Sequence, residues 1–80
     1  MSESHAALSR ADNAGLNSLT TDKICQEMGA KLSFSAGDQP LTGLWRTYQF
    51  KDGSLLDIHA NGCSAVDIKN MGATTVPFSK

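Results

Sequence analysis

The sequence predicts a small α+β domain, in which an antiparallel β-meander of three to five strands packs one face against one main helix. The spacing of apolar residues changes from a helical period to an alternating one near residue 31. Two glycine-containing loops, Lys51-Asp52-Gly53 and Ala60-Asn61-Gly62, separate alternating runs of the kind that form hairpins. A length of 80 residues is that of a single domain, which we assign to residues 1–80.

The segment 19–28 carries the signals of the main helix. Residues 20–22 supply side-chain oxygens and negative charge for the free N–H groups at a helix start. Ile24 and Met28 lie four residues apart and therefore share the face that meets the sheet. Gly29 predicts the end of the helix, because glycine takes the left-handed C′ conformation at little cost.

Residues 1–18 form either a short helix or a loose arm. Ala7, Leu8 and Ala11 fall on one narrow helical stripe, and Gly15 lies where such a helix would end. The stripe offers little apolar area, so the sequence leaves both alternatives open.

The strands are predicted from alternation of apolar and polar residues. Leu32 and Phe34 alternate with polar neighbours, which indicates an edge strand that buries both side chains. Further strand-like runs are 44–50, 54–59 and 63–69, followed by a β-prone tail at 74–76 that Pro77 confines to an edge or to coil.

The hydrophobic pattern fixes the register of the first hairpin. A three-residue loop at 51–53 pairs Tyr48 with Leu56, whereas a two-residue loop would bring Asp57 onto the apolar face. A type I turn closed by a left-handed glycine is the usual three-residue hairpin loop, so we expect a positive φ at Gly53.

In the second hairpin, glycine is again the third residue of the predicted loop. We therefore expect a three-residue loop at 60–62 with a left-handed Gly62. That register pairs Leu56 with Val66 and turns Cys63 away from the core. The expected inner face consists of Tyr48, Phe50, Leu56, Ile58, Val66 and Ile68.

The opposite face then carries a candidate partner-binding patch. Trp45 is its expected anchor, because tryptophan combines a large apolar area with an N–H donor and is enriched at binding hot spots. The alternative is that Cys63 acts as a small hydrophobe shielded by Trp45. The patch residues are Trp45, Thr47, Leu55, Asp57, His59 and Cys63.

A thiol or metal site at His59 and Cys63 is the rival interpretation of this patch. Cross-strand neighbours are close enough for a cysteine nucleophile to meet a histidine base, with Asp57 to orient the imidazole. A flat sheet face provides neither a cleft nor an oxyanion hole, and "HANGC" supplies only one pair of metal ligands. We therefore expect no catalytic residue, no metal and no cofactor.

Composition excludes several classes of function. The net charge is −1, and the seven Lys and Arg are scattered, so no basic face for nucleic acid is expected. Eight acidic residues are too few for a mimic of DNA. The N-terminal segment lacks the features of a signal peptide, and no apolar run approaches membrane-spanning length. Two cysteines do not make a disulfide framework, which favours reduced thiols in a cytoplasmic protein.

The stretch "GLWRTYQFKDGSLLDIHANG" resembles two kinds of small protein. Gly43-x-Trp45 followed by "F-x-D-G-S" is similar to strands of lipocalin-like domains, but this chain is too short to close such a barrel. "Y-x-F-x-D" ahead of a hairpin, after an N-terminal helix, resembles the layout of some small phage-encoded anti-CRISPR inhibitors. That resemblance implies an inhibitor that occupies a site on a large host complex, without catalysis or a cofactor.

We therefore expect a small non-enzymatic protein that acts by stoichiometric binding to another protein, a host complex or a second copy of itself. The resemblance makes a mobile-element inhibitor of host defence the expected biological setting.

Overall fold

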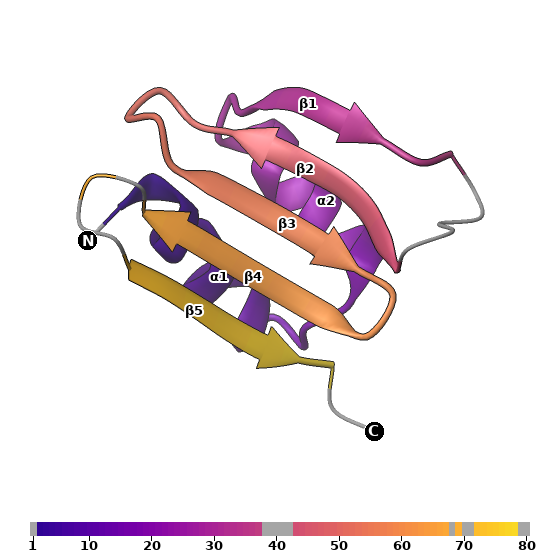
Figure 1. Cartoon of the computed structure of the whole chain (residues 1–80). Coiled ribbons are helices and arrows are strands. Elements are labelled where there is room, and N and C mark those ends of the chain that lie inside the picture. Colours follow the sequence, from indigo (N-terminus) through magenta and orange to yellow (C-terminus); the bar gives the residue numbers. More distant parts are fainter. Residues whose placement is uncertain (1, 38–42, 68, 70–71, 79–80) are drawn as a thin grey trace.

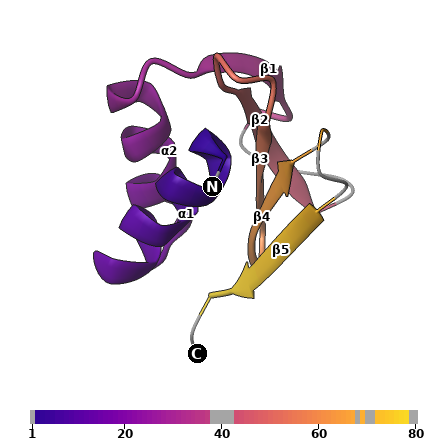
Figure 2. The same ribbon diagram turned by 90° about the vertical axis from the view of Figure 1, so that its left-hand side faces the viewer.

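A computed structural model of the chain describes residues 2–37, 43–67, 69 and 72–78. The described elements form two layers: a five-stranded antiparallel sheet and a pair of helices that lie on the same face of it (Figure 1, Figure 2). The helices are α1 (Glu3–Asn13) and α2 (Ser18–Glu27), and the strands are β1 (Lys31–Ser35), β2 (Leu44–Gln49), β3 (Leu55–His59), β4 (Gly62–Asp67) and β5 (Gly72–Pro77).

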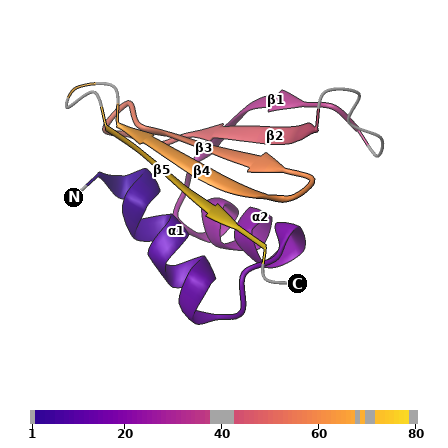
Figure 3. The same cartoon turned by 60° about the horizontal axis from the view of Figure 1, so that its bottom comes forward.

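The sheet is a simple meander in the order β1-β2-β3-β4-β5, with every neighbouring pair antiparallel. The predicted α+β class and the meander are therefore confirmed. The expectation of one main helix was incomplete, because α1 covers as much of the sheet as α2 does. Cα atoms of α1 lie within 8 Å of those of β3 and β4, and α2 approaches β3 in the same way (Figure 3).

Helix α1 resolves the alternatives for the N-terminal segment. Ala7, Leu8 and Ala11 are buried on one stripe, as the helical reading of this segment predicted. The Ser2 side chain caps the helix by accepting a hydrogen bond from the His5 backbone N–H. Alanines on the buried stripe keep the helix close to the sheet, so a segment with little apolar area still forms part of the core.

Helix α2 begins earlier than the sequence indicated. Asn17 is the N-cap, and its side chain accepts from the Thr20 backbone N–H. Thr21 and Asp22, expected among the capping residues, lie inside the helix and are buried. Gly29 follows the helix with φ +79°, which confirms the predicted left-handed end.

The first hairpin follows the predicted register. Tyr48 pairs with Leu56, and the Phe50 N–H donates to the Ser54 carbonyl oxygen at 2.9 Å. Gly53 has φ +87°, as a three-residue loop closed by glycine requires. The inner face of β2 and β3 is therefore the predicted one.

The second hairpin was predicted one residue out of register. Leu56 pairs with Ala65 and Ile58 pairs with Cys63, so only Ala60 and Asn61 lie between the paired strands. Gly62 belongs to β4 and does not have a positive φ. Its lack of a side chain serves another purpose, because a Cβ there would lie 2.5 Å from the Val76 carbonyl oxygen.

This shift exchanges the two faces of β4. Cys63 and Ala65 are buried beneath the helices, and Val66 pairs with Leu55 on the opposite face. The predicted inward position of Val66 was wrong, and Ile68 lies outside the described residues. Small residues are favoured on the inner face of β4 because α1 packs closely against that strand.

Strand β1 departs from its prediction too. A bulge between Leu32 and Phe34 pairs Leu32 with Tyr48 but Phe34 with Thr47, so the two apolar side chains point to opposite faces. Each is 46% exposed, which contradicts the expectation that both are buried.

Candidate functional site: the uncovered sheet face

The face of the sheet opposite the helices is not covered by any described element (Figure 2). Cross-strand pairing arranges its side chains in rows. One row is Lys31, Gln49, Leu55, Val66 and Ala73, the next is Phe34, Thr47, Asp57, Ser64 and Thr75, and the last is Leu44, His59, Gly62 and Pro77.

Four of the six predicted site residues share this face. Thr47 and Asp57 are direct partners, and the Thr47 hydroxyl donates to Asp57 Oδ1 at 2.8 Å. Leu55 and His59 lie on the same strand and point the same way as Asp57. The prediction that these side chains gather on one face is therefore confirmed, whereas their role in binding stays a prediction.

Cys63 does not belong to this face. Its thiol is fully buried on the helix side and lies 3.6 Å from the Thr21 hydroxyl oxygen, while His59 is on the other side of the sheet. Burial raises the pKa of the Cys63 thiol, and burial raises the pKa of Cys25 to about 12. Because His59 and Cys63 lie on opposite faces of the sheet, the structure does not bring this predicted pair together.

Within residues 2–37, 43–67, 69 and 72–78, no group of three or more His, Cys, Asp or Glu side chains is placed to hold an ion.

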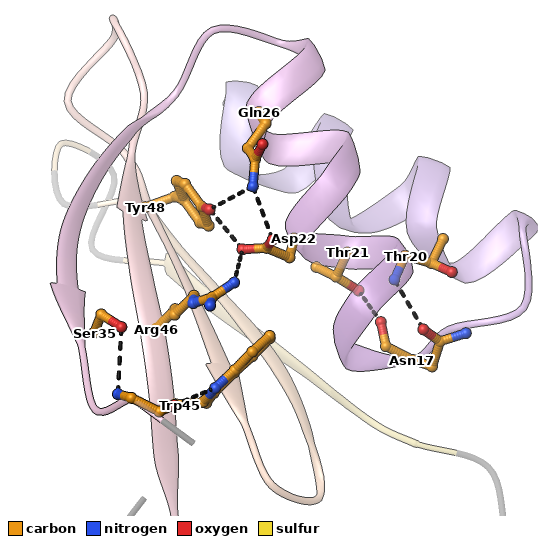
Figure 4. A network of polar contacts seen from close by, with 10 residues as sticks. Asn17, Thr20, Thr21, Asp22, Gln26, Ser35, Trp45, Arg46 and Tyr48 are labelled. Carbon is orange, nitrogen blue, oxygen red and sulfur yellow. Dashed lines mark hydrogen bonds and ion pairs between the residues drawn. The ribbon is translucent and has the colours of Figure 1, made fainter. Parts of the chain in front are cut away.

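Trp45 is not the outward anchor that the sequence predicted. A bulge between Leu44 and Arg46 gives the outward position opposite His59 to Leu44. The indole instead packs against the edge of the core, and its Nε1 donates to the Gly37 carbonyl oxygen at 2.7 Å (Figure 4). The Arg46 guanidinium carbon lies 3.9 Å from the centroid of the Trp45 rings, a cation–π geometry.

Arg46 leads from this stack into a polar network between β2 and α2 (Figure 4). Its Nη1 lies 2.8 Å from Asp22 Oδ1, the same oxygen that accepts the Tyr48 hydroxyl at 2.5 Å. Gln26 donates to the other Asp22 oxygen at 2.9 Å. Burial, with the Asp22 hydrogen bond, raises the pKa of Tyr48.

The network links helix α2 to strand β2 through the Asp22 carboxylate. Both carboxylate oxygens of Asp22 are occupied, and each of its partners comes from α2 or β2. This network was not predicted from the sequence, because Asp22 was assigned to the cap of the helix. The i, i+4 spacing of Asp22 and Gln26 on α2 was the available signal.

A second polar cluster lies at the start of α1, where Ser2 Oγ is 2.6 Å from His5 Nδ1. A serine beside a histidine suggests a nucleophile and its base, but such a pair also needs free donors for an oxyanion. Here the first backbone N–H groups of the helix are already bonded, and Ser2 is 7% exposed. The backbone N–H of Glu3 donates to the Asp52 carboxylate, that of Ser4 donates to the Ser54 hydroxyl, and that of His5 donates to the Ser2 hydroxyl.

Comparisons with protein-family models, curated proteins and solved structures find no match to this chain. None of the described helices is long and apolar enough to cross a membrane. The geometry defines the chain as a two-layer α+β domain with one open sheet face, and the uncovered face is its candidate functional site.

Proposed function

We propose that the protein is a non-enzymatic binding module that docks its uncovered sheet face onto another protein with fixed stoichiometry. The observation that carries the proposal is the one-sided placement of the helices, which leaves Leu44, Leu55 and Val66 without a covering layer. Antiparallel sheets tolerate one solvated face when its side chains are polar, so apolar residues there favour a contact surface.

The charge of this face supports a protein partner over nucleic acid. Among the described residues assigned to its rows, Lys31 is the only Lys or Arg, and Asp57 lies near the centre. Phosphate contacts need several cations on one surface, whereas a protein interface combines an apolar centre with scattered polar groups. Thr47, Ser64 and Thr75 supply such polar groups in the row next to Leu55, Val66 and Ala73.

The biological setting is a finer proposal that rests on the resemblance to anti-CRISPR inhibitors alone. In that setting the partner is a cytoplasmic host-defence complex, and binding blocks one of its working surfaces. The uncovered face is compatible with such a role because occupation of a site requires complementary shape and no chemistry.

The test is affinity capture from a lysate of the host, followed by reconstitution with the purified captured protein. Val66→Lys places a charge between Leu55 and Ala73 on the uncovered face, while Leu19→Lys places the same charge on α2 at a residue that is 72% exposed. We expect an equimolar complex with the wild type and with Leu19→Lys, and at least about a 10-fold loss of affinity with Val66→Lys. Equal binding by the two variants would reject the proposed face.

A further inference from the structure

The uncovered face is hollowed at one end, where residues of the β3–β4 turn line the hollow. Figure 1 shows the position of this turn between the two strands. The hollow has a volume of about 420 Å³. Gly62 pairs with Pro77 in the last row of the face, and both residues line the hollow together with His59. Ser64 and Thr75 close the side that faces the next row.

The polar groups around the hollow leave hydrogen-bonding capacity unused. The Ser64 and Thr75 hydroxyl oxygens lie 2.9 Å apart, so one donates to the other and the pair keeps one further donor. The His59 imidazole has no hydrogen-bond partner among the described residues, although it is half-buried. A ligand here can therefore both donate to the imidazole and accept from the hydroxyl pair.

The remaining wall is uncharged and consists of Gly43, Ala60, Asn61, Gly62 and Pro77, of which only Asn61 has a polar side chain. The exposed Pro77 ring offers a flat carbon surface beside the Gly62 backbone, and no Asp, Glu, Lys or Arg is among the described lining residues. Asp57 is the cross-strand partner of Ser64, at the edge of the hollow. An anion entering the hollow would therefore meet a like charge. These features select a flat, neutral group with a hydrogen-bonding end.

We infer that this hollow receives a tyrosine side chain of the partner protein, an inference that rests on the proposed function. A phenol ring packs on the Pro77 ring beside the Gly62 backbone, and its hydroxyl reaches His59 or the Ser64–Thr75 pair. Tyrosine is also enriched at the centres of protein interfaces. The single tyrosine of this chain, Tyr48, is 3% exposed, so the side chain comes from a different protein.

The inference is tested by titrating isotope-labelled protein with N-acetyl-tyrosinamide and following backbone amide signals by NMR. N-acetyl-phenylalaninamide is the matched probe without the hydroxyl, and methyl glucoside represents a sugar ligand. We expect the tyrosine probe to shift the signals of Gly62, Ser64 and Thr75, and the phenylalanine probe to bind about 3- to 10-fold more weakly.

Two variants separate the hollow from the rest of the face. Ser64→Leu fills the hollow and should abolish these shifts, whereas Val66→Leu, two residues along the same side of β4, should preserve them. Thr75→Val keeps the shape and should reduce tyrosine binding towards the phenylalanine level. Absence of local shifts, stronger binding of the glucoside, or insensitivity to Ser64→Leu would overturn the inference.

Those outcomes are distinct from failure of the proposed function. If the captured partner still loses affinity with Val66→Lys while the tyrosine probe does not bind, the tyrosine is rejected and the binding face stands. If Val66→Lys has no effect on capture, the face itself is rejected.

Discussion

Gly62 lies against the backbone of β5, so that a Cβ at this position would stand 2.5 Å from the carbonyl oxygen of Val76. The same Cβ would lie 2.7 Å from the Pro77 Cα. The obstacles are backbone atoms of a paired strand and cannot move aside as a side chain can. The glycine therefore determines how closely β4 and β5 pair at the end where the hollow lies.

Gly62→Ala should destabilise the fold because the added methyl group forces these strands apart. We expect the free energy of unfolding to fall by about 1–3 kcal/mol, the usual range for overpacking. Gly72→Ala is the matched control, since it pairs at the other end of β5 and a Cβ there meets no atom within 4 Å. Denaturant melts measure both changes, and similar stabilities for the two variants would contradict the close approach.

The buried thiols should be inert in the native protein. Cys25 and Cys63 are fully buried with raised pKa values, so a disulfide reagent at pH 8 should label both only as fast as the chain opens. Unfolding in guanidinium should release both at once.

Val66→Cys provides the internal control for this measurement, because the new thiol lies on the uncovered face. We expect one rapidly labelled thiol in this variant and none in the wild type. Rapid labelling of Cys63 in the native wild type would mean that its side chain points away from the core, as in the register predicted from the sequence.

Trp45→Ala should weaken the fold itself. The variant loses the Arg46 stack, the hydrogen bond to Gly37 and the packing against the core edge, which together should cost about 1–3 kcal/mol. Phe34→Ala removes a side chain that is 46% exposed and should cost less than about 1 kcal/mol. A Trp45→Ala protein as stable as the wild type, compared by thermal melts, would mean that the indole does not stabilise the core.

Asp52 makes part of the stability dependent on pH. The Ser54 hydroxyl and then the Glu3 backbone N–H hydrogen-bond its carboxylate and lower its pKa from 3.8 to about 2. A lowered pKa in the folded state means that the stabilisation is complete above about pH 4 and is lost as the pH falls through about 2.

Asp52→Asn should therefore be less stable than the wild type at pH 7, and the difference should fade between pH 4 and 2. Asp12→Asn, at an exposed position on α1, is the control and should show little difference at any pH. Melting temperatures at pH 7, 4 and 2 measure the effect. A gap between Asp52→Asn and the wild type that persists unchanged at pH 2 would rule out the carboxylate as its cause.

The parts of the fold that the sequence predicted are those with a strong contrast between two faces. On β2 and β3, Tyr48 and Leu56 alternate with Thr47 and Asp57, so a one-residue slip would bury a charge. The contrast on β4 is weaker, because its inward residues are Cys63 and Ala65 while Val66 points outward. The hydrophobic pattern therefore predicted that Val66 points inward. The close approach of α1 to β4 instead requires small residues on the inner face of this strand.

β-Bulges and contacts between residues far apart in the sequence also could not be predicted from the sequence. The bulges in β1 and β2 move Phe34 outward and Trp45 inward, and nothing in the local sequence marks them. Asp52 accepts from the backbone of Glu3, 49 residues away, so this cap of α1 has no local signature. Of the six residues predicted for the candidate face, Thr47, Leu55, Asp57 and His59 lie on it, because their positions depend only on the first hairpin. Trp45 and Cys63 do not.

The central claim, that the uncovered sheet face meets the partner, is tested most directly by methyl cross-saturation in the reconstituted complex. The partner is protonated and irradiated, while this chain is deuterated except for its methyl groups. We expect signal loss at Leu55 and Val66 on the uncovered face and none at Leu19 on α2. Loss at Leu19, with the methyl signals of Leu55 and Val66 unchanged, would place the partner on the helices and contradict the account.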